Sequence, residues 1–262
     1  MKRVLIEKIP IKLPGELEAF TNNAKIYDSS CSAEARVYFI EKDGGYYLKC
    51  AEKNSLKNEA LMTDYFHKKG LGANVVSYVS DDRDFLITSK VGGEDGTTKR
   101  FLDDPKRLSE VLGTNLRKLH DLDFSDCPVK NRTESYRSLV DSNFKKSVFE
   151  LSLTERLYKF KSKDEAYRVF IEGKNELKTD TLLHGDYCLP NVMLNDDFSL
   201  SGFIDLGNGG VGDRHIDVFW GRWTLLFNLG TDEYAQRFFD AYGKDKINFE
   251  LLKTVAAAEV FG

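Results

Sequence analysis

The stretch that most constrains this chain is residues 182–217, LLHGDYCLPNVMLNDDFSLSGFIDLGNGGVGDRHID. Asp186 follows a glycine, Asn191 comes five residues later, and Asp205 ends an apolar run two residues before Gly207. Carboxylate and amide oxygens are the ligands that hard divalent cations prefer in proteins. An apolar strand that ends on an acid beside a glycine is poorly suited to a hydrophobic core, so the stretch predicts a site that holds a cation.

Length and charge limit the class of protein. A chain of 262 residues is long for one compact domain and suits two lobes. Its 41% apolar and 31% charged residues are typical of a globular enzyme, and a net charge of −4 argues against a nucleic-acid binder. The sequence has no signal peptide, no membrane-spanning apolar run and no metal-ligand spacing among its four cysteines. We therefore expect a cytoplasmic protein with reduced thiols and no nucleic-acid or membrane partner.

The first fifty residues favour strands, and the pattern continues to about residue 90. We expect strands at 36–40, 46–50, 75–79 and 84–89, with turns at 42–45 and 81–83. Residues 55–69 have helical periodicity. We expect Ser55 to cap this helix, and its buried stripe to consist of Leu61, Met62, Tyr65 and Phe66.

Residues 91–96, VGGEDG, interrupt the pattern and predict a hinge. Beyond it we expect helices at 105–119, 218–229, 234–242 and 249–260. The segment 131–180 is compatible with helix, with Leu139, Phe144, Val148, Leu151 and Leu157 spaced for burial. The expected fold class is α+β, with a small antiparallel β lobe carrying one helix at 1–90 and a larger, mainly helical lobe at 97–262.

Phosphoryl transfer from a nucleoside triphosphate needs groups that the sequence supplies once each. Asp186 is the candidate base that orients the hydroxyl of the acceptor. Asn191 and Asp205 are the candidate ligands of Mg²⁺. Lys49, on an expected strand, is the candidate lysine for the nucleotide phosphates, and Glu59, on the next helix, is its candidate ion-pair partner.

The spacing of Asp186 and Asn191 resembles the catalytic loop of protein kinases, and Ile204-Asp205-Leu206-Gly207 resembles their metal-binding D-F-G element. Taken together, HGDYCLPNVML and SGFIDLGxxGxxDRxxD are similar to the aminoglycoside 3′-phosphotransferases, bacterial antibiotic kinases with a protein-kinase-like fold. Residues 119–128, LHDLDFSDCP, also resemble a segment of these enzymes. The resemblance extends, with gaps, from about residue 30 to the C-terminus.

The resemblance implies a role for each of these residues, in agreement with the roles above. It places Lys49 at the α- and β-phosphates of ATP or GTP, Tyr47 against the adenine, and Ser89 to Val91 at its edge, with a loop at 29–36, including Ser32, over the phosphates. It implies that Mg²⁺ is bound by Asn191 and Asp205. It also implies that a hydroxyl of an aminoglycoside is phosphorylated, which inactivates the antibiotic and confers resistance.

The sequence departs from the family pattern in the region expected to hold the cationic acceptor. Glu259 and Phe261 match the acidic and aromatic residues near the end of the last helix, and both are candidate acceptor ligands. However, Ala258 replaces an acid, and Phe227-Asn228 stands where many relatives carry acids. For three other residues we expect supporting roles: His184 and Asp217 hold the backbone of the catalytic loop, and His120 packs in the core.

We therefore interpret the chain as an aminoglycoside 3′-phosphotransferase that uses ATP or GTP with Mg²⁺, and we expect a monomer. One alternative is a kinase of another small hydroxylated metabolite on the same scaffold. A second is a regulatory protein that binds nucleotides without transferring phosphate, although the intact Lys49, Asp186, Asn191 and Asp205 argue against it. The position of the phosphorylated hydroxyl and the choice between ATP and GTP stay open.

Overall fold

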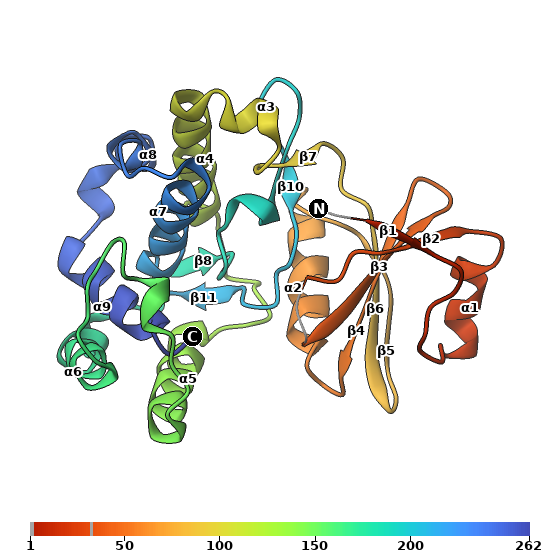
Figure 1. Cartoon of the computed structure of the whole chain (residues 1–262), viewed down its shortest axis with the longest axis horizontal. Coiled ribbons are helices and arrows are strands. Elements are labelled where there is room, and N and C mark those ends of the chain that lie inside the picture. The colour runs from red at the N-terminus through yellow and green to blue at the C-terminus, as the bar shows by residue number, and fades with distance from the viewer. Residues whose placement is uncertain (1–2, 32–33) are drawn as a thin grey trace. The chain divides into compact units, whose positions relative to one another are not determined.

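The computed structural model describes residues 3–31 and 34–262, and within this range the chain divides into two compact units (Figure 1). The first unit contains Met1–Asp95 and Val192–Gly207, and the second contains Gly96–Asn191 and Asn208–Gly262. The expected boundary near residue 96 is therefore present. The expectation that residues 97–262 form one lobe is wrong for Val192–Gly207, because this segment packs with the first unit.

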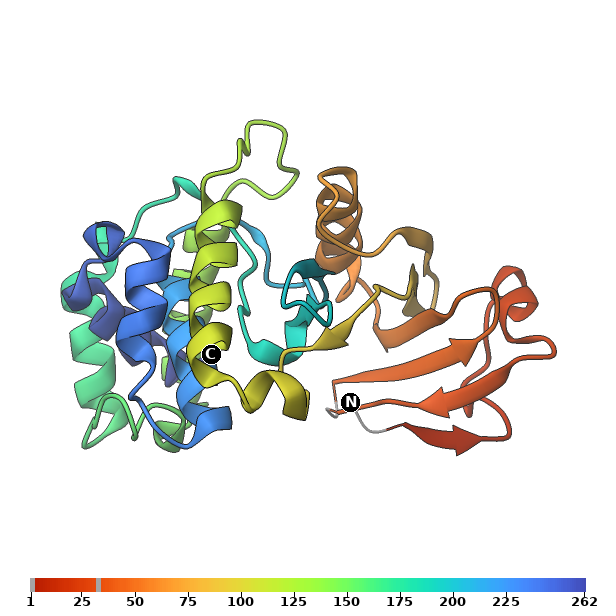
Figure 2. The ribbon, with the colours of Figure 1, turned by 90° about the horizontal axis from the view of Figure 1, so that it is seen from above.

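The first unit is built on a six-stranded antiparallel sheet with the strand order β1-β2-β3-β4-β6-β5. Its elements are β1 (Val4–Ile6), α1 (Gly15–Thr21), β2 (Lys25–Asp28), β3 (Ala35–Glu41), β4 (Tyr46–Glu52), α2 (Lys57–Lys68), β5 (Val75–Ser80) and β6 (Arg83–Ser89). The strands and turns expected between residues 36 and 89 are all confirmed. Figure 2 shows β1 to β4 from above, in red and orange.

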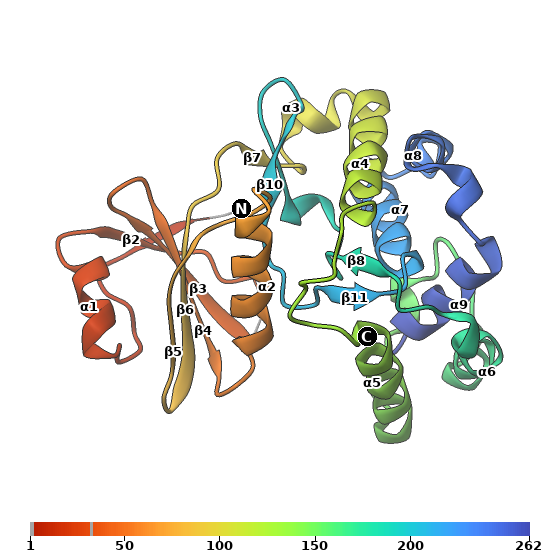
Figure 3. The same ribbon diagram turned by 180° about the vertical axis from the view of Figure 1, so that it is seen from behind.

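The sheet of the first unit is covered by a helix on each face (Figure 3). On one face, Leu17 of α1 joins a core that includes Tyr38, Ile40, Leu48 and Cys50. On the other face, α2 packs against the sheet through Leu56 and Ala60. The helix α1 was not expected, because only seven residues form it and its buried side chains are few. Leu61 is 44% exposed, so it does not belong to the buried stripe of α2.

A second, three-stranded sheet explains why Val192–Gly207 belongs to the first unit. Its order is β10-β9-β7, with β7 (Glu94–Asp95), β9 (Val192–Leu194) and β10 (Leu200–Phe203). The backbone N–H of Phe203 donates to the carbonyl of Leu71 at 2.7 Å, and its ring meets that of Phe66 edge to face. Part of the expected hinge is thus the strand β7, and hinge motion at residues 91–96 stays a prediction.

The second unit is mainly helical and contains one two-stranded sheet, β11-β8. Its elements are α3 (Lys99–Leu102), α4 (Pro105–His120), α5 (Arg132–Lys146), η1 (Leu151–Leu153), α6 (Lys163–Gly173), η2 (Lys174–Glu176), β8 (Thr181–Leu183), η3 (Leu189–Asn191), β11 (Gly210–Gly212), α7 (His215–Leu229), α8 (Ala235–Tyr242), η4 (Lys244–Lys246) and α9 (Phe249–Glu259). The four helices expected beyond the hinge are confirmed. Leu139 and Val148, however, are 43% and 52% exposed and do not line the core as expected.

Along the described residues, no helix combines the length and the apolar character that crossing a membrane requires.

Candidate active site

Lys49 is positioned by the alternation of side chains along β4. Leu48 and Cys50 point into the core of the sheet, so Lys49 projects from the opposite face. Its Nζ lies 2.8 Å from Oε2 of Glu59, and the expected ion pair is present. The same Nζ lies 2.8 Å from Oδ1 of Asp205, although 156 residues separate the two in sequence. Three of the residues predicted for phosphate and metal binding therefore lie together in the first unit.

The two carboxylates determine the charge state of Lys49. Burial by itself would lower the pKa of this amine, but Glu59 and Asp205 raise the pKa above its ordinary value. Lys49 therefore keeps its positive charge. Asp205 has a φ of +59°, a left-handed conformation that a non-glycine residue adopts at an energetic cost. In this strained conformation the carboxylate of Asp205 is directed at the Nζ of Lys49.

Helix α2 brings Glu59 to Lys49, and its N-terminus is anchored by a buried acid. The backbone N–H of Leu56 donates to Oδ2 of Asp84 at 2.9 Å. Tyr78 and Ser80 also donate to the Asp84 carboxylate, which is fully buried. Ser55, the expected cap, instead donates its hydroxyl to the carbonyl of Glu52. The expectation was wrong because the acceptor comes from a neighbouring strand, 28 residues away in sequence.

The structure gives the surroundings of two residues that were expected near the adenine. The N–H of Ser89 donates to the carbonyl of Asn74 at 2.9 Å, and the expected contact of Ser89 with the adenine edge stays a prediction. The ring of Tyr47 packs on Phe39 with centroids 5.2 Å apart. The guanidinium of Arg3 lies 3.7 Å from the centroid of Phe39 and donates to the Tyr47 hydroxyl at 2.6 Å. Sequence reasoning did not identify Arg3, because an isolated basic residue carries no signal.

Two other predicted contacts of the nucleotide remain predictions. Val91 is partly exposed, and its backbone role at the adenine edge is not tested. Ser32 lies outside the described residues.

In the second unit, the loop from His184 to Asn191 is held by Asp217 on α7. Oδ2 of Asp217 accepts the N–H of His184 at 2.8 Å, and Oδ1 accepts that of Gly185 at 2.7 Å. Nε2 of His120 lies 3.1 Å from Oδ2 of the same carboxylate. Nδ1 of His120 lies 2.9 Å from the hydroxyl oxygen of Tyr242. Asp217 thus holds the loop by hydrogen bonds, as expected, and His120 is a hydrogen-bonded residue of the core.

The loop presents Asp186 next to Asn191. The Nδ2 group of Asn191 donates to Oδ2 of Asp186 at 2.9 Å and to its carbonyl oxygen at 3.0 Å. Asn191 is buried, whereas Asp186 is partly exposed. This arrangement fixes the orientation of the Asp186 carboxylate.

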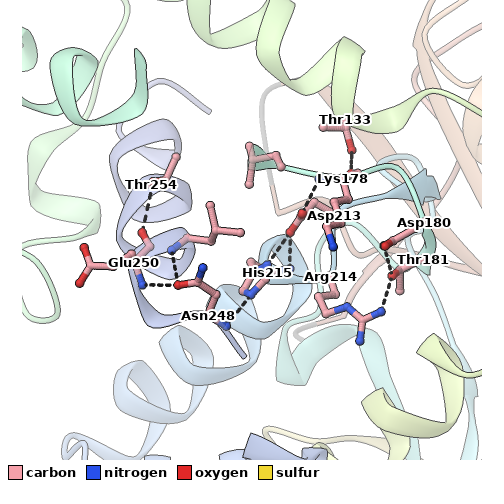
Figure 4. A network of polar contacts seen from close by, with 12 residues as sticks. Thr133, Lys178, Asp180, Thr181, Asp213, Arg214, His215, Asn248, Glu250 and Thr254 are labelled. Atoms are coloured by element: carbon pink, nitrogen blue, oxygen red, sulfur yellow. Dashed lines mark hydrogen bonds and ion pairs between the residues drawn. The ribbon is translucent and has the colours of Figure 1, made fainter. Parts of the chain in front are cut away.

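The start of α7 is fixed by a separate polar network (Figure 4). Asp213 accepts the N–H of Lys178 at 2.6 Å and both the N–H and Nδ1–H of His215, at 2.9 and 2.7 Å. Nε2 of His215 accepts the N–H of Asn248, which caps α9. Arg214 donates to the Thr181 hydroxyl. The network ties the helix that carries Asp217 to the ends of β8 and α9.

The two predicted acceptor ligands, one at the end of α9 and one just beyond it, have different surroundings. Glu259 is buried and accepts a hydrogen bond from the hydroxyl of Tyr136 at 2.8 Å. Burial, together with the nearby charge of Asp186, raises the pKa of Glu259 to about 7, an effect that hydrogen bonds from Tyr136 and Trp220 oppose. Phe261 is fully buried, so its side chain is a core residue and not the acceptor ligand that was expected. Its ring packs edge to face against those of Phe144 and Tyr167.

With this geometry in view, comparison with known proteins establishes the family. The model of the family described as "Phosphotransferase enzyme family" matches residues 31–253, which is most of the chain. This chain belongs to the phosphotransferase enzyme family. The resemblance to aminoglycoside phosphotransferases seen in the sequence is thereby confirmed.

Individual relatives of this phosphotransferase agree with the assignment. It is 50% identical over 261 residues to a probable aminoglycoside 3′-phosphotransferase of Lactococcus lactis, covering 99% of this chain and 97% of that protein. It is 32% identical over 169 residues to an aminoglycoside 3′-phosphotransferase of Niallia circulans, covering 63% and 62%. Aminoglycoside phosphotransferase APH(3″)-Id of Streptomyces rimosus has the same fold, with a TM-score of 0.74, 21% identity and coverage of 94% and 96%. The expected α+β, kinase-like fold is confirmed.

The donor atoms of this phosphotransferase fit the expected Mg²⁺. In the second unit, Asn191 uses its Nδ2 group for Asp186 and keeps a carbonyl oxygen of the kind that Mg²⁺ takes. In the first unit, Asp205 offers a carboxylate oxygen of the same kind. Mg²⁺ in phosphoryl-transfer sites takes one or two such protein ligands and completes its shell with water and phosphate oxygens. Nowhere in the described part of the chain do three or more acidic, histidine or cysteine side chains form a metal-binding group.

Proposed function

We propose that the protein transfers the γ-phosphate of ATP or GTP to a hydroxyl of an aminoglycoside, at the 3′ position, and so confers resistance to the antibiotic. The observation that carries the proposal is the pair of Asp186 and Asn191 on a loop held by the buried Asp217. Identity of 50% to a probable aminoglycoside 3′-phosphotransferase along nearly the whole chain supports the choice of acceptor.

Asp186 acts on the acceptor. One carboxylate oxygen is held by Asn191, so the other can accept a hydrogen bond from the attacking hydroxyl and orient its lone pair toward the phosphorus. Since the transition state of phosphoryl transfer is loose, positioning contributes more than full removal of the proton.

Lys49 acts on the nucleotide. Its ammonium group is held by Glu59 and would move little when the phosphates bind beside it. Asn191 and Asp205 would hold Mg²⁺, which when bound neutralises charge on the phosphate oxygens. Arg3, Tyr47 and Val91 would complete the nucleotide side of the site. We further propose that the enzyme works in the cytoplasm as a monomer.

Asp186→Ala tests the assignment of the base. The variant removes the group that orients the hydroxyl and leaves Lys49 untouched. We therefore expect kcat to fall by about 10³-fold or more, with the Kd for ATP within about twofold of wild type. Asp103→Asn, a change at a surface acid paired with Lys99, is the matched control and should leave kcat unchanged. Turnover of Asp186→Ala at the wild-type rate would refute the role of Asp186.

The acceptor is tested by coupled detection of ADP with kanamycin and neomycin, and by growth of a susceptible bacterium that expresses the chain. We expect turnover and resistance. Turnover only on a simple amino alcohol or sugar would identify a metabolite kinase instead. Tight binding of ATP with no turnover on any acceptor would identify a regulatory protein.

A further inference from the structure

Arg132, the first residue of α5, is a partly buried cation of the second unit. The N–H of Val211 in β11 donates to the carbonyl of Val129 at 2.8 Å, which holds the start of α5 against the two-stranded sheet. The other strand of this sheet, β8, leads directly into the loop that carries Asp186. The sheet therefore places Arg132 close to this loop.

A single side chain connects the guanidinium of Arg132 to the loop. Its Nη2 group donates to Oδ1 of Asn208 at 2.6 Å. Asn208 packs directly against Gly185, because a Cβ atom built on Gly185 would lie 2.8 Å from the Cβ atom of Asn208. Gly185 is the residue before Asp186. The positive charge of Arg132 thus lies behind the residue that orients the acceptor.

The charged groups that act on Arg132 are acids of the same unit. Burial lowers the pKa of Arg132, and the attraction of Glu259 and Asp217 opposes this effect only in part. Glu259 is also near enough to Asp186 for their charges to interact. Within the described residues Arg132 forms no ion pair, and its hydrogen-bond partner is Asn208. Arg132 is therefore a cation beside an acidic cluster, without a carboxylate bound to it.

The stability of the fold does not explain this charge at position 132. Burial removes water from the guanidinium, and no carboxylate of the described residues at ion-pair distance replaces that water. The start of a helix also carries partial positive charge, which disfavours a cation as the first residue of α5. A guanidinium has several N–H donors, and the bond to Asn208 uses one nitrogen. The other donors of Arg132 can bind an anion.

The proposed reaction brings an anion to this loop. Asp186 orients the acceptor hydroxyl, so the γ-phosphoryl group must come within bonding distance of that hydroxyl. The acidic cluster of Asp186, Asp217 and Glu259 would repel the phosphate oxygens. A guanidinium offsets this repulsion, and its paired N–H donors match the spacing of phosphate oxygens.

We propose that Arg132 contacts the transferring phosphoryl group and stabilises the negative charge on its oxygens in the transition state. A bond forms between the acceptor oxygen and the γ-phosphorus, and the bond from that phosphorus to the bridging oxygen breaks. ADP leaves with the electron pair of the broken bond, and the hydroxyl proton passes to Asp186. The inference rests on the proposed function, because it takes Asp186 as the base, and it adds a phosphate-binding residue on α5.

Crystals soaked in tungstate test the anion site without nucleotide or acceptor. Tungstate is a tetrahedral dianion like phosphate, and the anomalous scattering of tungsten locates it. We expect tungstate at the guanidinium of Arg132 in the wild-type protein and none at this place in Arg132→Gln. Glutamine keeps an N–H donor for Asn208, so the fold of the variant should be maintained.

Kinetics with kanamycin, followed as release of ADP, test the role in transfer. We expect Arg132→Gln to lower kcat by about 100-fold, with the Kd for ATP and the KM for kanamycin within about twofold of wild type. Arg132→Lys keeps the charge and loses the paired donors, so its kcat should lie within about tenfold of wild type. Arg168→Gln, the same change at an exposed arginine of α6, is the matched control and should behave like wild type.

Asn208→Ala distinguishes phosphate binding from a purely structural role of Arg132. The variant removes the hydrogen-bond partner of Arg132 but keeps the guanidinium and the Cβ atom that packs on Gly185. If Arg132 acts on the phosphoryl group, kcat should stay within about fivefold of wild type. If Arg132 served only to hold Asn208, kcat would fall as far as in Arg132→Gln.

The outcomes separate this inference from the proposed function. Tungstate at Arg132, with kcat lost in Arg132→Gln and largely kept in Asn208→Ala, supports the inference. Absence of tungstate from Arg132 in the wild-type protein overturns it, as does an equal kcat in wild type and Arg132→Gln, or an equal loss in Arg132→Gln and Asn208→Ala. If the wild-type protein releases no ADP with any acceptor, the proposed function fails, and the tungstate experiment alone decides whether Arg132 binds phosphate.

Discussion

Gly185 is the single residue on which the conformation of the loop before Asp186 depends most. Its φ is +87°, and a Cβ atom at this position would lie 1.9 Å from the carbonyl oxygen of Asn208. A side chain would therefore meet both backbone strain and a rigid neighbour. We expect Gly185→Ala to lower the free energy of unfolding by more than about 3 kcal/mol and to abolish transfer, as measured by urea denaturation and ADP release.

Gly230 provides the control for the backbone strain alone. It ends α7 with a φ of +74°, but nothing lies within 4 Å of a Cβ atom built there. Gly230→Ala should cost about 1 kcal/mol and leave kcat unchanged. Equal losses of stability in the two variants would mean that the contact with Asn208 is not what makes glycine necessary at position 185.

A second effect at the residue scale is the pH dependence caused by Glu259. Its pKa rises from an ordinary 4.5 to about 7 because the carboxyl group is buried. Between these values the folded protein keeps a proton that the unfolded chain has lost, so the contribution of Glu259 to stability falls as the pH rises. Glu259→Gln removes this titration and keeps an oxygen for Tyr136. We expect the two proteins to be equally stable near pH 4, and the variant to be more stable by up to about 3 kcal/mol at pH 8. Parallel stability curves over this range would contradict the prediction.

At the scale of elements, helix α2 matters because it carries Glu59 to Lys49. Its N-terminus is bound by Oδ2 of a buried acid, Asp84, whose Oδ1 accepts from the Ser80 hydroxyl at 2.6 Å. Asparagine offers only one acceptor there. We expect Asp84→Asn to cost about 2 kcal/mol of stability and, by loosening the pair of Lys49 and Glu59, to raise KM for ATP several-fold.

The control for α2 is Asp64→Asn on the exposed face of the same helix, where the acid pairs with Lys68. It should change stability by less than about 0.5 kcal/mol and leave KM for ATP unchanged. An unchanged KM in Asp84→Asn, despite the loss of stability, would show that the anchor of α2 is structural and does not position Glu59.

At the scale of the whole molecule, the first unit is assembled from two distant parts of the chain. Residues 1–95 alone lack β9, the partner of β7, and Asp205, a partner of Lys49. We expect a fragment of residues 1–95 to show no cooperative unfolding and no binding of ATP. Because Asp95 pairs with Met193, a short turn can join residue 95 to residue 192 as a hairpin. The fragment with 192–207 attached in this way should unfold cooperatively in near-ultraviolet circular dichroism, and equal behaviour of the two fragments would contradict the prediction.

The sequence by itself determined the features that depend on neighbours along the chain. Alternation along β4 put Lys49 on the face opposite to Leu48, helical spacing located α4, α7, α8 and α9, and a five-residue step brought Asn191 to Asp186. Such patterns are visible because a period of two or of 3.6 residues repeats within a short window. The reaction class followed from the same local spacing.

Only the tertiary structure decided the contacts between residues far apart in sequence. It paired Lys49 with Asp205 and assigned Val192–Gly207 to the first unit. It also showed that Asp84, and not Ser55, accepts the hydrogen bond at the N-terminus of α2. It also buried Phe261, which sequence similarity had suggested for the acceptor. The physical reason is that burial and long-range pairing depend on which surfaces pack together. The periodic pattern of apolar residues within one helix or strand does not say which distant residue will contact it.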